Sequence, residues 1–113
     1  MHPRMAGPHA AAHHTRRRFL HIVVFYAERA WAYAMHLKKE NEKELSLPRR
    51  RHLIRRLRKA QAWAQQLLEL CRECCDARSQ LEADAYAAWL GGSLLLEQEK
   101  DWETALAKFK RAK

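Results

Sequence analysis

Apolar residues recur every three or four positions along most of the chain, which is the period of an amphipathic α-helix. The pattern predicts a first helix over residues 17–44, with these buried positions: Leu20, Val24, Ala27, Trp31, Ala34 and Leu37. It predicts a second helix over residues 48–75, whose single apolar stripe is Leu53, Leu57, Ala60, Ala64, Leu67 and Cys71. Pro48 suits the first turn of this second helix, because the N–H that proline lacks would have no partner there.

The C-terminal part of the chain predicts two shorter helices. One spans residues 78–97, is interrupted at Gly91-Gly92, and has these apolar positions: Leu81, Ala85, Ala88 or Trp89, and Leu95 or Leu96. The other begins at Asp101, with Trp102, Ala105, Leu106 and Phe109 on its apolar face. Such a pair is typical of a tetratricopeptide hairpin. The predicted fold is therefore all-α, with antiparallel helical hairpins in a tetratricopeptide-like stack of about four helices.

The first fifteen residues differ from the rest. They contain two Pro, four His and no acidic residue, and they show no hydrophobic period. We therefore predict a disordered leader over 1–15 and a helical domain over 16–113, which we expect to be incomplete at its C-terminal end. A mitochondrial transit peptide is the alternative interpretation of the leader.

Basic residues are concentrated in the first half of the chain. The whole sequence of 113 residues has a formal charge of +9, but residues 1–63 contain 15 basic and 4 acidic residues, whereas residues 64–113 contain 7 basic and 9 acidic ones. The densest basic segment is 49–59, where seven of eleven residues are basic and none is acidic. A segment of this kind repels itself unless an anion lies nearby.

The segment 49–59 predicts nucleic-acid binding. On a helical wheel, Arg51, Arg55 and Arg58 lie nearly opposite Leu53 and Leu57, so they form an outward ridge. Arginine outnumbers lysine six to one in the segment, and its planar guanidinium binds phosphate through two parallel hydrogen bonds. A solvated helix face and a nuclear localisation signal are the alternative interpretations. The predicted main phosphate contacts are Arg51, Arg55, Arg56, Arg58 and Lys59, and the secondary ones are Arg49, Arg50, Arg16, Arg17 and Arg18.

Other chemistry has weaker support in the sequence. We find no catalytic arrangement, no phosphate-binding glycine loop and no apolar run long enough to cross a membrane, so we expect neither enzyme nor cofactor nor membrane insertion. Cys71-x-x-Cys74-Cys75 has the local spacing of a zinc site, but the sequence has no further ligand pair, so we expect the three cysteines to be small buried side chains instead. Their odd number does not suit a disulfide framework, and this favours a reducing, intracellular compartment. Core packing is likewise favoured over base stacking for the four tryptophans, and Trp63, at the flank of the basic helix, is the one candidate for exposure.

Four segments, 27–38, 51–60, 81–86 and 99–105, resemble the family of the 68-kilodalton subunit of the eukaryotic signal recognition particle. The resemblance extends from Phe19 to Lys113. It implies part of that family's N-terminal RNA-binding domain, which binds the particle's 7S RNA near a branched junction and supports cotranslational targeting to the endoplasmic reticulum. In that family an arginine-rich helix enters a groove of the RNA, and residues 49–59 would play part of this role.

The resemblance also implies partners and a location. The partners are the signal recognition particle RNA and other particle proteins, including the 72-kilodalton subunit, which would bind through a region absent from this sequence. The location is cytoplasmic, with a nucleolar assembly stage and association with the endoplasmic reticulum. The competing hypothesis is a tetratricopeptide-like protein-interaction module whose basic segment only localises it.

Overall fold

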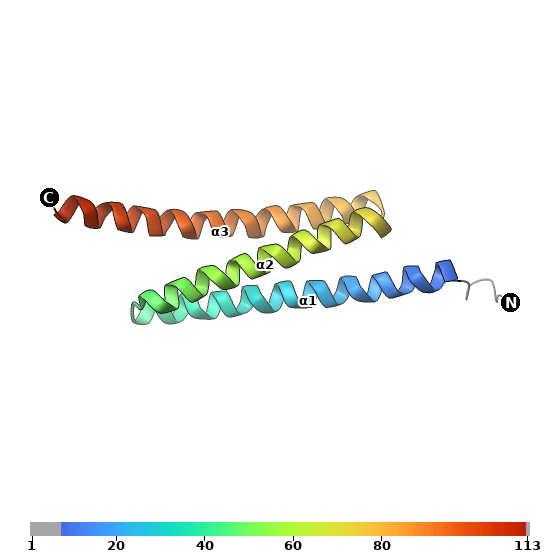
Figure 1. Ribbon diagram of the computed structural model, residues 1–113, viewed down its shortest axis with the longest axis horizontal. Helices are drawn as coiled ribbons and strands as arrows, with labels where there is room; N and C mark the ends of the chain where they lie inside the picture. The colour runs from blue at the N-terminus through green and yellow to red at the C-terminus, as the bar shows by residue number, and fades with distance from the viewer. Residues whose placement is uncertain (1–7, 113) are drawn as a thin grey trace.

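The described part of the chain consists of three long helices joined by short turns. The computed structural model describes the backbone of residues 8–112 and the side chains of residues 18–111. The helices are α1 (Pro8–Lys43), α2 (Leu47–Cys74) and α3 (Ala77–Ala112), and no strand occurs among the described residues (Figure 1). The all-α fold class is therefore confirmed.

Ser46 fixes the turn between α1 and α2. Its extended backbone places it at the N-cap of α2, where its hydroxyl accepts a hydrogen bond from the N–H of Arg49 at 3.3 Å. Its own N–H donates to Asn41 Oδ1 at 2.8 Å, and Pro48 lies in the first turn as predicted. The start of the basic segment is therefore held in place by a capped helix end.

We expect Ser46→Ala to lower the free energy of unfolding by about 1 kcal/mol, because it leaves one N–H of the first turn of α2 without its acceptor. Chemical denaturation followed by circular dichroism measures the change. Ser93→Ala is the control, since the Ser93 hydroxyl only donates to the Trp89 carbonyl within α3. An equal loss in both variants would contradict the capping role.

Asp76 forms the turn between α2 and α3. Its carboxylate accepts a hydrogen bond from the N–H of Ser79 at 2.9 Å, and the Ser79 side chain together with this N–H lowers the pKa of Asp76 from its ordinary value. The side chain of Gln80 donates to the Cys75 carbonyl at 3.0 Å. Two residues are thus enough to reverse the chain, so α2 and α3 are antiparallel neighbours.

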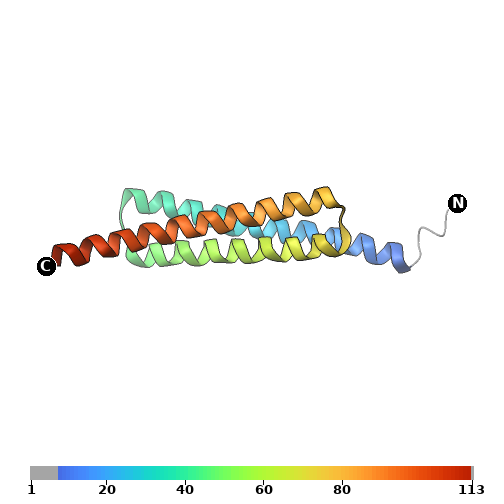
Figure 2. The same cartoon turned by 90° about the horizontal axis from the view of Figure 1, so that it is seen from above.

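The three helices form an elongated bundle with α2 in the middle. Helix α2 packs along both α1 and α3, and among the described residues side chains such as Lys38 with Glu97 and Trp31 with Trp89 reach across from α1 to α3. Figure 1 shows α2 crossing between α1 and α3, and Figure 2 shows from above that all three helices run along the long axis of the molecule. The molecule measures 77 × 23 × 16 Å, so every helix keeps a large solvent-facing side.

The predicted core stripe of α2 is confirmed. All six of its residues are buried. From α1 the buried side chains are Val23, Ala27, Ala30, Ala34 and Leu37. Leu20, Val24 and Trp31, also predicted on this face, are half-buried and pack at the edges of the core. The side of α2 opposite this core is therefore free to carry charge.

The prediction of separate third and fourth helices is wrong, because α3 is one continuous helix of 36 residues. Residues 98–100 contain no helix breaker, and the helix also passes through Gly91 and Gly92. The tetratricopeptide-like hairpin that depended on a break is therefore absent from the described residues.

The predicted buried face of α3 is also wrong. The residues that pack against α2 are Ala83, Ala87, Leu90 and Glu97, which recur with helical spacing. Leu81 is 70% exposed, Trp89 55% and Trp102 68%, and these larger apolar residues lie outside the α2–α3 contact. Small side chains let the two helices approach closely, and they determine which side of α3 is buried.

Helix α1 begins earlier than the apolar pattern predicted. The backbone is helical from Pro8, so residues 8–15 of the predicted disordered leader are helical, and residues 1–7 lie outside the described part. This stretch is rich in Ala, which has the highest helix propensity, and proline is favoured in a first helical turn. None of the described helices combines the length and apolarity that a bilayer crossing needs.

Candidate nucleic-acid interface

The ridge predicted on α2 lies in solvent. Arg51, Arg55 and Arg58 are exposed on the side of α2 opposite its buried stripe, and Lys59 is exposed beside them. Among the described residues, none of these four side chains forms an ion pair with a carboxylate. From Arg51 to Arg58 the helix rises about 10 Å. The ridge is thus a row of cations on a rigid support, available to an anion.

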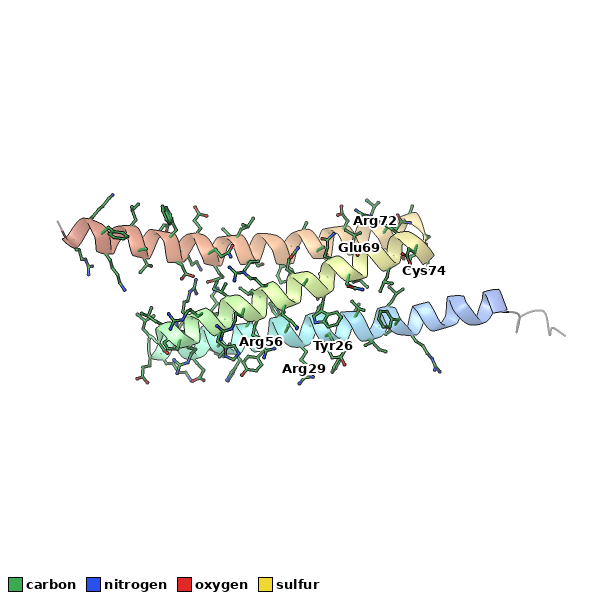
Figure 3. The ribbon with its side chains drawn as sticks, viewed as in Figure 1. Tyr26, Arg29, Arg56, Glu69, Arg72 and Cys74 are labelled. Atoms are coloured by element: carbon green, nitrogen blue, oxygen red, sulfur yellow. The ribbon has the colours of Figure 1, made fainter. Side chains whose placement is uncertain are left out.

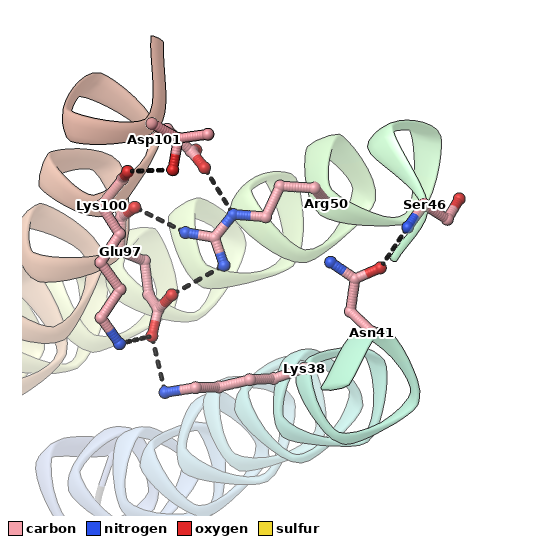
Figure 4. Close-up of polar contacts among 8 residues, drawn as sticks. Lys38, Asn41, Ser46, Arg50, Glu97, Lys100 and Asp101 are labelled. Atoms are coloured by element: carbon pink, nitrogen blue, oxygen red, sulfur yellow. Dashed lines mark hydrogen bonds and ion pairs between the residues drawn. The ribbon is translucent and has the colours of Figure 1, made fainter. Parts of the chain in front are cut away.

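Arg50 has a different role from the one its sequence position suggested. Its Nη1 atom lies 2.8 Å from Glu97 Oε2 and its Nε atom 2.6 Å from Asp101 Oδ1, while Nη2 donates to the Glu97 carbonyl at 2.6 Å. Lys38 of α1 reaches the same Glu97 carboxylate at 2.7 Å (Figure 4). Glu97 therefore ties the three helices together, and Arg50 faces α3 instead of an external ligand.

The environment of Glu97 favours its charged form. Burial alone would raise its pKa, but the hydrogen bonds from Lys38 and Arg50, together with their positive charges, lower the pKa below its ordinary value. Burial would lower the pKa of Arg50, and the bonds to Asp101 and Glu97 outweigh this and raise it. The cluster is thus a charged, hydrogen-bonded joint between helices.

The other predicted contacts differ in their surroundings. Arg49, in the first turn of α2, uses a guanidinium N–H to bond the Glu44 carbonyl at 2.7 Å, so it holds the preceding turn in place. Arg56 is half-buried, with its guanidinium 4.9 Å from the centre of the Tyr33 ring. Arg18 is exposed on α1, and the side chains of Arg16 and Arg17 lie outside the described part of the chain. The ridge and Arg56 therefore remain as the grouped cations.

A hollow next to the ridge combines aromatic and basic side chains. It has a volume of about 290 Å³, lies between α1 and α2, and we call it the Tyr26 pocket; its lining residues are Tyr26, Arg29, Ala30, Tyr33, Arg56, Lys59 and Trp63. The rings of Tyr26 and Trp63 are stacked with their centres 5.0 Å apart. Figure 3 shows Tyr26 and Arg29 of α1 near Arg56 of α2. The α2 side of this pocket shares Arg56 and Lys59 with the predicted contacts.

The sequence reasoning did not identify the α1 side of this pocket. Tyr26, Arg29 and Tyr33 follow each other at spacings of three and four residues, which places them on one face of a helix. That alternation of aromatic and basic residues indicates a binding surface on this side of α1. It was hidden because the same stretch also contains the stronger apolar pattern of the core.

A second hollow of about 610 Å³ lies between α1 and the turn that joins α2 to α3. Its lining includes the carboxylates of Glu28, Asp76 and Glu82 and no Lys or Arg. Tyr86 closes one side, and burial together with a hydrogen bond to Glu28 raises its pKa. This acidic lining is unsuited to a phosphate backbone, so the two hollows have opposite character.

The three cysteines line this second hollow. Cys71 is buried, as predicted, and Cys74 and Cys75 are half-buried with their Sγ atoms 3.8 Å apart. Burial and the neighbouring Cys71 raise the pKa of Cys75, which favours the neutral thiol. Among the described residues, no three His, Cys, Asp or Glu side chains are arranged to hold a metal ion.

Comparison with known proteins identifies relatives of this chain. Residues 6–113 match the family model described as RNA-binding signal recognition particle 68. The chain is 52% identical to signal recognition particle subunit SRP68 of Drosophila melanogaster over 97 residues, which is 84% of this chain and 15% of that protein. It is 38% identical over 96 residues to the subunit of the same name from Dictyostelium discoideum, covering 85% of this chain and 16% of the relative. It is 32% identical to the Schizosaccharomyces pombe subunit over 95 residues, which is 82% of this chain and 14% of that protein.

The chain thus spans about a sixth of the length of these relatives. No solved structure matches it. The family match covers all three helices and the basic segment of α2. Together with the shared identity, it shows that this chain belongs to the RNA-binding signal recognition particle 68 family.

Proposed function

We propose that the chain is a non-enzymatic RNA-binding module of the signal recognition particle. In this proposal the exposed ridge of α2 contacts the phosphates of the particle's 7S RNA. Arg51, Arg55, Arg56, Arg58 and Lys59 are the main contacts. Arg49 and Arg16 to Arg18 are secondary, and Arg50 is omitted because it is engaged with Glu97 and Asp101.

One observation carries the proposal. The ridge cations are exposed and lack carboxylate partners among the described residues, although the chain contains 13 acidic residues. A helix face kept only for solubility is usually interspersed with acids, which form salt bridges at i+3 and i+4. Unpaired arginines grouped on one face favour an external polyanion.

The finer parts of the proposal rest on family membership. As part of a signal recognition particle subunit, the chain would act in cotranslational protein targeting in the cytoplasm, with a nucleolar assembly stage and association with the endoplasmic reticulum. The 72-kilodalton subunit would be a partner through a region outside this sequence. Because the major groove of A-form RNA is narrow, we propose that the ridge meets the RNA at a junction or bulge, where the groove is wider.

The competing hypothesis of a peptide-binding tetratricopeptide module has lost its structural basis. It required a groove between two C-terminal helices, and residues 77–112 form one helix instead. Salt dependence separates the two hypotheses, because apolar anchoring of a peptide is insensitive to salt.

We expect the affinity for the particle's junction RNA to fall by roughly 10²- to 10³-fold between 50 and 200 mM salt if about five cations meet phosphates. The measurement is fluorescence anisotropy with labelled junction RNA and with a plain duplex of equal length. Tighter binding to the junction, with a steep salt slope, is the expected result. Affinity that hardly changes over this salt range would contradict phosphate binding by the ridge.

A further inference from the structure

We propose that the Tyr26 pocket binds a single unstacked nucleotide of the RNA, with the base against the aromatic rings and a phosphate between Arg29 and Lys59. The inference rests on the proposed function, because it names the feature of the RNA that the chain recognises. It goes beyond that function by assigning a second type of contact, to a base, in a pocket that adjoins the ridge and includes residues of α1.

The aromatic side chains of the pocket are only partly used by the core. Tyr26 and Tyr33 remain 39% and 44% exposed, and neither belongs to the buried clusters between the helices. The stacked rings of Tyr26 and Trp63, with 22° between their planes, form a small platform. A base that lies on such a platform extends the stack, and this works for every base because each has a π-face.

The positive charges around the pocket favour a nucleotide, which carries a phosphate, over an uncharged aromatic ligand. Arg29 on α1 and Lys59 on α2 are both exposed, and neither pairs with a carboxylate in the described part of the chain. No acidic side chain lines this pocket, in contrast to the larger hollow at the cysteines. The two cations come from different helices, so a phosphate between them would be held from both sides.

Arg56 preorganises the pocket. Its guanidinium lies 4.9 Å from the Tyr33 ring centre, and its Nε donates to His52 Nε2 at 3.4 Å. The position of this cation is therefore set before RNA arrives, which lowers the entropy lost on binding. An arginine held over a ring still has N–H groups at its edge that can donate to a base or a phosphate.

Size and position also favour one nucleotide. The volume of about 290 Å³ is just below the roughly 300–1,000 Å³ typical of small-molecule pockets, so the pocket is too small for a duplex. Lys59 lies one helical turn after Arg55, which joins the pocket to the ridge. A strand bound along the ridge can therefore turn one unpaired residue into the pocket, as single-stranded RNA commonly does on proteins.

The first test compares two RNAs of equal length that differ only by one unpaired nucleotide in an otherwise paired stem. We expect the wild-type chain to bind the RNA with the unpaired nucleotide roughly 5- to 150-fold more tightly, which is the usual effect of one stacked base. Tyr26→Ala should remove this preference. Phe19→Ala is the matched control, because Phe19 is another exposed aromatic residue of α1 and lies outside the pocket, whereas the ring of Phe25 packs edge-on against that of Tyr26. Circular dichroism verifies that both variants remain helical.

The second test examines the phosphate contact and the location of the base. Arg29→Ala should weaken binding more than Lys39→Ala, which removes an equal charge from an exposed position of the same helix outside the pocket. A 4-thiouridine at the unpaired position should cross-link, on irradiation, to a peptide that contains Tyr26 or Trp63. A cross-link confined to other peptides would overturn the assignment.

The outcomes separate the two proposals. If the wild-type chain binds RNA with a steep salt slope but Tyr26→Ala keeps the full preference for the unpaired nucleotide, the pocket assignment is wrong and the ridge assignment stands. Equal binding of paired and bulged RNA by the wild-type chain would also overturn the pocket assignment and leave the ridge assignment intact. If the chain binds no RNA at all, the proposed function fails first and the pocket assignment fails with it.

Discussion

Reversing two charges on the ridge, Arg55→Glu with Arg58→Glu, is expected to abolish RNA binding at physiological salt. Both side chains are exposed and opposite the core, so the substitutions reach no buried contact. Each lost charge-assisted hydrogen bond is worth about 1.5 kcal/mol or more, which predicts at least a 100-fold loss before the repulsion by the new carboxylates is added. Anisotropy with the junction RNA measures the loss.

The control for this experiment is the double variant Arg72→Glu with Arg78→Glu. It changes the net charge by the same amount, and both residues are exposed, one at the end of α2 and one at the start of α3. Arg78 has only an exposed ion pair with Glu82, which contributes little to stability. Equal loss of affinity in both double variants would mean that net charge alone, and not the ridge, governs binding.

Replacing Glu97 by alanine is expected to cause the largest loss of stability among single substitutions of charged residues. The Glu97 side chain is 6% exposed and accepts from Lys38 and Arg50, so its removal leaves two cations without their main partner. Breaking a buried charge pair in this way costs about 3 kcal/mol, with Asp101 still able to hold Arg50. Denaturant unfolding gives the free energy directly.

Glu99→Ala is the matched control, because Glu99 has the same charge, lies on the same helix and is exposed. Its removal should change the free energy of unfolding little. If Glu97→Ala and Glu99→Ala lower the free energy of unfolding by the same amount, the Glu97 joint does not hold the helices together.

The lowered pKa of Glu97 gives this stabilisation a pH dependence. Its folded-state pKa is below its ordinary value of 4.5, so its contribution is present above pH 4.5 and is lost as the pH falls through the folded-state value. The difference in stability between the wild type and Glu97→Ala should therefore shrink at acidic pH. A difference that grows on acidification would contradict this linkage.

Helix α2 was well predicted from sequence, and α3 was not. In α2 the apolar stripe lies on one side of the helix and the row of cations on the other, so the hydrophobic period and the charge pattern predict the same buried side. In α3, apolar residues are present on more than one side of the helix, and the pattern predicted that large ones such as Leu81, Trp89 and Leu96 are buried. The structure instead buries Ala83 and Ala87, whose advantage is close packing and not hydrophobicity.

The candidate site could be predicted only where it depends on the spacing of residues along a single helix. The ridge follows from local spacing on one helix, so its exposed side was correctly predicted. The role of Arg50 depends on partners 47 and 51 residues away, which no local pattern reveals. The Tyr26 pocket requires two helices to meet in a particular register, and sequence periodicity does not determine that register.

The most direct test of the ridge assignment is the salt slope of RNA binding for Arg55→Ala, compared with Arg72→Ala and the wild type. If Arg55 neutralises an RNA phosphate, removing it should reduce the slope of log affinity against log salt by about 1. Arg72→Ala, on the same helix but outside the basic segment, should leave the slope unchanged. An unchanged slope for Arg55→Ala, or an equal reduction in both variants, would contradict phosphate contact by the ridge.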